Sequence, residues 1–134
     1  MTQSTNLYSA TNSVFSTAST TLYGAFNSEG AARAAEVTSE APVQAKWRCG
    51  AATIKNMYAY CPTMGRTTDT TVNCRIAGAN TAVVITLTAS GGAGVYSDTT
   101  HTVSIADGDT FDYTLVTGRS EERRVGKECL RLCR

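Results

Sequence analysis

The sequence predicts an all-β domain made of two antiparallel sheets packed as a sandwich. Residues 72–76, 83–87 and 111–115 each alternate apolar and polar side chains with a period of two. Such alternation is typical of strands that bury one face. Thr, Ser, Ala and Gly are abundant and prolines are few, which suits turns and exposed strand faces. At 134 residues the chain has room for one such domain.

The other elements follow along the chain. Residues 1–19 form a polar arm with too few apolar side chains for a core, so the domain begins at Thr20. Ala, Arg and Glu favour a short surface helix over residues 31–40, before Pro42 interrupts regular structure. The further strands expected are 20–26, 43–49, 53–61, 95–96 and 102–105. Seven or so short strands at this spacing predict a sandwich or a barrel.

The strand over residues 53–61 is expected to direct Tyr58 and Tyr60 outward. Ile54 is an interior residue by type, and its spacing of three from Met57 predicts a bulge between the two. The outward tyrosines offer a contact surface, or they pair across strands with neighbours on the sheet. The sequence leaves both readings open.

A hairpin is expected to join the strands over residues 71–76 and 82–88. Asn73 and Arg75 are expected on the solvent-facing side of the first strand. The turn residues are Gly78, Ala79 and Asn80.

The C-terminal segment differs from the body in composition. Residues 119–134 carry six basic and three acidic residues, so that residues 1–118 have a net charge of −2 within the total of +1. A weakly acidic body has no electrostatic footprint for nucleic acid or an anionic membrane. Residues 119–129, RSEERRVGKEC, resemble a translated sequencing adapter, which implies a non-native tail. The alternative is a charged arm that binds nucleic acid or a partner.

The start of the chain lacks the basic residues and apolar run of a secretory signal, and no stretch reaches the ~20 apolar residues of a membrane span. We therefore expect the chain to be made in the cytoplasm without a signal peptide. Cys49, Cys61 and Cys74 lack the spacing of a zinc site and are expected to be free thiols. A Cys61–Cys74 bridge is the alternative in an oxidising medium.

His101 is the only histidine, which excludes histidine-rich metal sites and pairs of imidazoles. No motif marks a nucleophile near it, so we predict no catalytic residue and no enzyme. A calcium site, with hard oxygen ligands, is offered by Asp98, Asp107, Asp109 and Asp112. The sequence favours the alternative that Asp107 and Asp109 bind local backbone amides in a tight turn, without any cofactor.

Four phrases of the body carry a resemblance: IKNMY (54–58), CRIAGANT (74–81), GVYSDTTHTV (94–103) and ADGD (106–109). Together they resemble a jelly-roll domain common in uncharacterised phage and environmental proteins. The architecture is similar to that of tumour-necrosis-factor and complement-C1q heads. The resemblance covers about residues 20–118 and implies a two-sheet jelly roll that assembles, often as a trimer, in a virion, tail or extracellular fibre. The closing strand is absent, so the jelly roll is expected to lack its last strand.

The function expected is structural: a self-associating subunit of a phage virion, tail appendage or related surface assembly. Such a subunit would be found in the virion or an extracellular assembly, with no nucleic-acid or membrane partner. The alternative is a carbohydrate-binding module whose aromatic side chains stack on a glycan. The residues expected to contact a glycan or another subunit are Trp47, Tyr58, Tyr60 and Tyr96. An exposed aromatic platform favours sugar binding, and aromatics buried between copies favour assembly.

Overall fold

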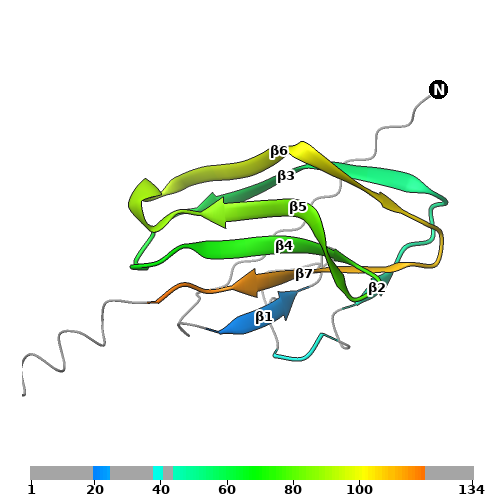
Figure 1. Cartoon of the computed structure of the whole chain (residues 1–134), viewed down its shortest axis with the longest axis horizontal. Helices are drawn as coiled ribbons and strands as arrows, with labels where there is room; N and C mark the ends of the chain where they lie inside the picture. The colour runs from blue at the N-terminus through cyan, green and yellow to red at the C-terminus, as the bar shows by residue number, and fades with distance from the viewer. Residues whose placement is uncertain (1–19, 25–37, 41–43, 120–134) are drawn as a thin grey trace, which may run out of the picture.

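The computed structural model describes residues 20–24, 38–40 and 44–119, which form an all-β structure (Figure 1). Its elements are β1 (Thr21–Gly24), β2 (Ala45–Lys46), β3 (Ala52–Cys61), β4 (Thr70–Ile76), β5 (Ala79–Leu87), the short 3-10 helix η2 (Ala89–Gly91), β6 (Gly94–Ile105) and β7 (Thr110–Val116). Within these ranges, none of the chain lies in a helix with the length and hydropathy that a membrane span requires.

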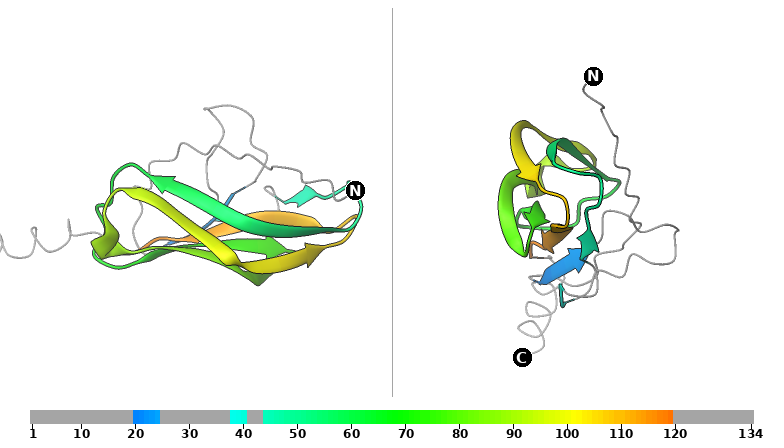
Figure 2. Two further views of the ribbon diagram at one scale, coloured as in Figure 1. Left: turned by 90° about the horizontal axis from the view of Figure 1, so that it is seen from above. Right: turned by 90° about the vertical axis from the view of Figure 1, so that its right-hand side faces the viewer.

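Two antiparallel sheets pack as a sandwich (Figure 2). The large sheet has the strand order β1-β7-β4-β5, with β2 also paired to β7, and the small sheet pairs β3 with β6. The chain passes from the small sheet into β4 and β5, returns to it in β6, and re-enters the large sheet in β7. The expected two-sheet antiparallel sandwich is confirmed, with two strands in one layer against five in the other among the described residues.

Most of the interior is filled by the three segments with period-two alternation, and Trp47 and Ile105 complete it. β4, β5 and β7 direct alternate side chains between the sheets, where the most deeply buried are Cys74, Val83, Ile85, Phe111 and Leu115. At one end of the core the Trp47 ring meets Phe111 edge to face, with centroids 5.8 Å apart and planes at 85°. Aromatic rings favour this arrangement because the positive edge of one meets the negative face of the other.

β3 contains the predicted bulge. The register with β6 shifts between Lys55 and Met57, where Asn56 alone lies opposite residues 99–101. Asn56 has a left-handed φ of 58°, a conformation that asparagine adopts more readily than most residues. The irregularity therefore places two more residues on β6 than on β3. Because the left-handed Asn56 lies between them, Ile54 and Met57 are both partly buried although they are three positions apart.

Two predicted strand boundaries were wrong. Residues 94–105 form the single strand β6 rather than two short strands, because the polar run in its middle stays paired around the bulge. The strand expected over residues 43–49 is reduced to β2, since the chain then turns Trp47 into the core. Of the helix expected over residues 31–40, the structure describes only 38–40, which are not helical. The N-terminal arm and residues 120–134 lie outside the described part.

The expectation that Asn73 and Arg75 face solvent was wrong. The Arg75 side chain is 13% exposed, and its Nε and Nη2 atoms donate to the Glu40 carboxylate at 2.7 and 3.2 Å. The guanidinium also lies 5.5 Å from the centroid of the Tyr23 ring, within the range of a cation–π interaction. Residues distant in sequence therefore cover the outer face of the large sheet as well.

The cysteines of the described residues are free thiols: Cys49 is exposed, Cys61 half-buried and Cys74 buried. The alternative Cys61–Cys74 bridge is not formed, since both cysteines are free thiols. Burial raises the pKa of Cys74 to about 11, so this side chain packs as a neutral, weakly polar group.

The hairpin between β4 and β5 turns one residue earlier than the sequence predicts. Ile76 pairs with Ala79, which leaves Ala77 and Gly78 as the central residues. Their φ angles of 50° and 77° are both positive, as a two-residue type I′ turn requires. Glycine adopts such angles without cost, whereas the Cβ atom of Ala77 approaches the backbone.

We expect Ala77→Asn to increase the free energy of unfolding by about 0.5–1 kcal/mol, because Asn-Gly suits both positive φ angles of this turn. Urea unfolding monitored by circular dichroism measures the change. The matched control is Ala79→Asn, at the exposed first residue of β5, where no gain is expected. A loss of stability in Ala77→Asn would contradict the turn conformation.

Candidate interaction surface

Three large apolar side chains are exposed together on the outer face of the small sheet. Tyr58 and Tyr60 of β3 are 62% and 72% exposed, and Val95 of β6 is 69% exposed. Tyr60 pairs with Val95, and Tyr58 pairs with Ser97 two positions along, so the three side chains are neighbours on one face. They are termed the outer patch. Contiguous exposed apolar groups mark binding surfaces, whereas isolated ones are ordinary.

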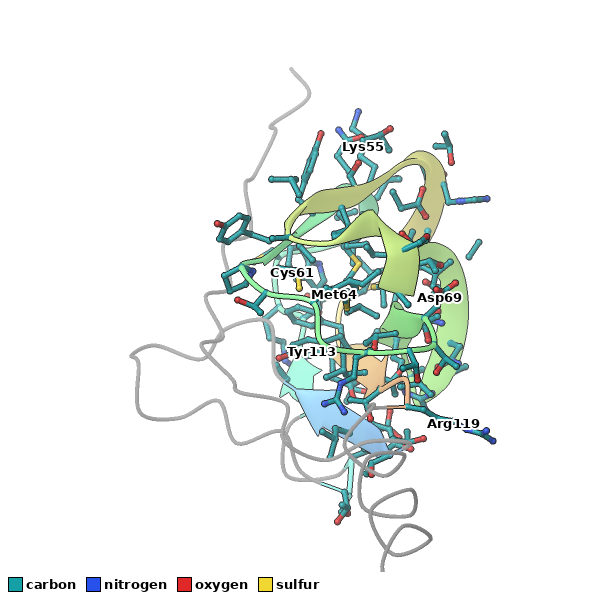
Figure 3. All side chains as sticks on the ribbon, turned by 90° about the vertical axis from the view of Figure 1, so that its left-hand side faces the viewer. Lys55, Cys61, Met64, Asp69, Tyr113 and Arg119 are labelled. Atoms are coloured by element: carbon teal, nitrogen blue, oxygen red, sulfur yellow. The ribbon has the colours of Figure 1, made fainter. Side chains whose placement is uncertain are left out.

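The bulge divides this face into two halves of different character. On the N-terminal side of Asn56 the outward residues of β3 are Thr53 and Lys55, both exposed. Figure 3 shows Lys55 at the outer surface of the small sheet, pointing away from the body of the sandwich. On the C-terminal side the outward residues are the two tyrosines. The apolar surface is therefore confined to one end of the sheet.

Asp98 fixes the bulge from the inner side of β6. Its Oδ1 accepts hydrogen bonds from the backbone N–H groups of Thr100 and His101, both at 3.1 Å. Its Oδ2 accepts from the backbone N–H of Val84 at 3.0 Å, and this bond joins the small sheet to β5 of the large sheet. The Val84 amide first, and then those of His101 and Thr100, hold the pKa of Asp98 well below its ordinary range, against the opposing effect of burial.

His101 belongs to the same cluster. Its Nδ1 atom lies 2.9 Å from Asp98 Oδ2 and 3.2 Å from Thr100 Oγ1. A carboxylate, an imidazole and a hydroxyl are the groups of a hydrolytic triad, but there the two partners contact different ring nitrogens. Here both partners lie at Nδ1, and the Thr100 hydroxyl also bonds Asp98 Oδ1 at 3.1 Å. The cluster shapes the bulge, and we assign it no nucleophile.

The structure removes Trp47 and Tyr96 from an exposed contact surface. Trp47 is 8% exposed, and its indole N–H donates to the carbonyl of Gly50 at 2.5 Å. Tyr96 alternates with Val95 and points toward the inner side, where its hydroxyl donates to the carbonyl of Gly92 at 2.7 Å. Of the predicted contact residues, Tyr58 and Tyr60 are the two that the structure places together on the surface.

Asp107 and Asp109 flank Gly108 in the turn between β6 and β7. Asp109 Oδ2 accepts from the backbone N–H of Ala106 at 2.9 Å, and Asp107 Oδ1 accepts from that of Gly50 at 3.2 Å. Asp109 thus binds a local backbone amide, as the favoured alternative to a calcium site supposes, whereas the amide bound by Asp107 is 57 residues away in sequence.

The four aspartates offered as calcium ligands are not brought together. Asp98 lies at the bulge, Asp107 and Asp109 lie in an exposed turn, and Asp112 is fully buried on β7 opposite Arg75. Over residues 20–24, 38–40 and 44–119, no group of three or more His, Cys, Asp or Glu is placed to hold a metal ion.

Comparison of the chain with protein-family models, with curated proteins and with solved structures found no match. The jelly-roll resemblance, which rests on short phrases, stays a prediction. Function must therefore be argued from the surface and its chemistry.

Sequence reasoning missed two parts of this surface. Val95 lies beside the tyrosines because it pairs with Tyr60, and the register of the two strands cannot be read from either strand alone. The role of Asp98 had a signal in the sequence, namely an acidic residue at an inward position of a strand followed by Thr-Thr-His. Short polar side chains in such a run commonly bind nearby backbone amides.

We expect Asp98→Ala to lower the midpoint of thermal unfolding by several times more than Asp107→Ala, because it leaves three partly buried backbone amides without an acceptor. The contribution of Asp98 is present above its ordinary pKa of 3.8 and is lost as the pH falls through the depressed pKa of the folded state. Circular dichroism melts at neutral and acid pH measure both effects. Equal midpoints for the two variants would contradict the role assigned to Asp98.

Proposed function

We propose that this chain is a structural interaction protein, a β-sandwich subunit that assembles with further copies through the outer patch. The observation that carries the proposal is the exposure of Tyr58, Tyr60 and Val95 at neighbouring positions on one face. Tyrosine is enriched at protein interfaces because its ring supplies apolar area while its hydroxyl still bonds to water or a partner.

The assembly uses the face of the small sheet rather than its edge. An edge strand that pairs with another copy must present an even row of backbone groups. β3 is interrupted by the bulge at Asn56, carries Lys55 beside it, and is followed directly by Pro62. Bulges, lysines and prolines are features that oppose edge-to-edge pairing. The face with the two tyrosines has no such protection.

The setting that we propose is a phage virion, a tail appendage or a related surface assembly, with a trimer as the expected form. The support for self-association is the outer patch itself. The support for this setting is the sequence resemblance alone.

A carbohydrate-binding module is the second candidate. It is favoured by the spacing of Tyr58 and Tyr60, two exposed rings on alternate positions of one strand, with the hydroxyl of Ser97 beside them in register. Since Trp47 is in the core and Tyr96 faces inward, such a platform would consist of the two tyrosines only.

We expect Tyr58→Ser/Tyr60→Ser to weaken self-association at least tenfold, because truncating a central aromatic side chain commonly costs ~2 kcal/mol of binding free energy. Sedimentation velocity over a concentration series should give multiples of the 14.2 kDa chain for the wild type and a shift to the single chain for the variant. Both side chains are exposed, so the unfolding midpoint should stay within the range of ordinary surface substitutions.

The matched control is Val116→Ser, which removes the other large apolar side chain exposed among the described residues, 44% exposed on the large sheet. It should leave the association unchanged. A wild-type protein that remains a single chain at every concentration would overturn the assembly proposal. If that single chain then bound a glycan on an array, and the double variant did not, the second candidate would replace it.

A further inference from the structure

Two carboxyl groups meet on the outer face of the large sheet, on the opposite side of the molecule from the outer patch. Asp112 is fully buried, and within the described part of the chain no donor reaches either of its carboxyl oxygens. The group that faces it is the carboxylate of Glu40. Two ionised carboxylates are both acceptors and repel each other, so the contact of the buried Asp112 with the partly exposed Glu40 is favoured by a proton or another cation between them.

The neighbouring arginine does not satisfy Asp112. Arg75 lies directly opposite it in the register of β4 and β7. Its N–H groups are directed to Glu40, to the side chain of Asn80 and to the carbonyl of Gly78. Arg75 thus holds Glu40 as a carboxylate, and this hydrogen bond lowers the pKa of Glu40. The charge of Arg75 also acts on Asp112 and opposes the rise of its pKa, but no N–H group of Arg75 reaches the Asp112 carboxyl oxygens.

Two more polar atoms on the same face lack a hydrogen bond. The Oδ1 atom of Asn73 and the Oγ1 atom of Thr114 are buried, and neither has a partner among the described residues. Thr114 is two positions from Asp112 on β7, and Asn73 is opposite Thr114 on β4. Beside the Glu40 carboxylate the protonated form of Asp112 is favoured, because its O–H can donate to that carboxylate and an ionised Asp112 cannot. Burial first, and then the charge of Glu40, raise the pKa of Asp112 to about 6.

We propose that Asp112 and Glu40 together bind one proton, and that this shared proton fastens residues 38–40 to the outer face of the large sheet. Asp112 takes the proton from solution and donates its O–H to the Glu40 carboxylate. When the proton returns to solution, two negative charges face each other across the same contact. Glu40 then retains its hydrogen bonds with Arg75 and Gln44, and the attachment of residues 38–40 is weaker.

The other titratable groups near the pair do not replace this proton. From β4 come Arg75, a permanent cation, and Cys74, whose raised pKa keeps it a neutral thiol. From β1 comes the ring of Tyr23, which lies against Arg75. From β2 comes Lys46, which is exposed and pairs with Thr110, two positions before Asp112.

The direction of the pH effect follows from the raised pKa. The folded protein retains a proton that the unfolded chain releases above the ordinary value of 3.8. The stability due to Asp112 is therefore fully present below 3.8 and is lost as the pH rises through about 6. Residues 38–40 should be held more firmly on the acid side of this range.

The first experiment compares the pH dependence of thermal unfolding in the wild type, Asp112→Asn and Asp107→Asn. The asparagine amide at position 112 donates permanently to Glu40, so the fall in midpoint on raising the pH through about 6 should disappear. Asp107→Asn removes a carboxylate from an exposed turn, and the fall should persist. A wild-type midpoint with no fall over this range, or a fall that survives in Asp112→Asn, would overturn the proposal.

The second experiment needs no variant to fold. Carbon-13 NMR of the Asp112 carboxyl should show titration near pH 6, with the Glu40 carboxyl responding in the same range. Amide exchange protection of residues 38–40, corrected for the intrinsic rate, should decrease as the pH rises through it. Titration of Asp112 near its ordinary pKa of 3.8, or amide exchange protection of residues 38–40 that does not change with pH, would contradict the proposal.

Added calcium chloride distinguishes a proton from a metal ion. If calcium raised the unfolding midpoint of the wild type above pH 6 and left Asp112→Asn unchanged, the pair would be a metal site and the proton would be the wrong occupant. The proton proposal expects no effect of calcium on either protein. The test of the proton proposal is independent of the self-association assay, because Asp112 and Glu40 lie on the large sheet and the outer patch lies on the small sheet.

Discussion

The carboxylate of Asp98 is the contact on which the shape of the small sheet depends. It is a charged group at an inward position, where a strand of this kind ordinarily carries an apolar side chain. A buried charge is stable only where donors surround it. The donors are amides of Thr100 and His101 in the same strand and of Val84 in the other sheet. One side chain thus closes the bulge and ties the two layers together, and the orientation of the outer patch follows from both.

The large sheet is buried on its inner face and partly covered on its outer face, by different chemistry on each. An antiparallel sheet commonly leaves one face to water. Here the inner face is apolar. Its burial removes apolar surface from water, and this non-directional hydrophobic effect supplies most of the stability of such a core. The outer face contains the ion pair of Arg75 with Glu40 and the buried acid Asp112, whose interactions depend on direction and on charge. The inner face determines that the sheets pack, and the outer face determines where residues 38–40 lie.

The parts of this structure that could be predicted are those that follow from the local alternation of apolar and polar residues. The strands β4, β5 and β7 and the outward tyrosines follow from a period of two, and the bulge follows from the spacing of Ile54 and Met57. The burial of Trp47 and the environment of Asp112 could not be predicted in this way. The ion pair of Arg75 spans 35 residues of sequence, and no local pattern encodes such a contact. The candidate surface was predictable to the same extent: its tyrosines were visible, and Val95 required the register.

The bulge at Asn56 also limits the outline of any molecule that docks on the small sheet. A bulge bends its strand and increases the local twist, so the segments on either side of it face in different directions. A flat partner can lie against the tyrosines or against Thr53 and Lys55, but not against both at once. The contact area of a docked partner is therefore short along the strand. An assembly of many copies would have to repeat this small contact, because the bulge prevents a longer one.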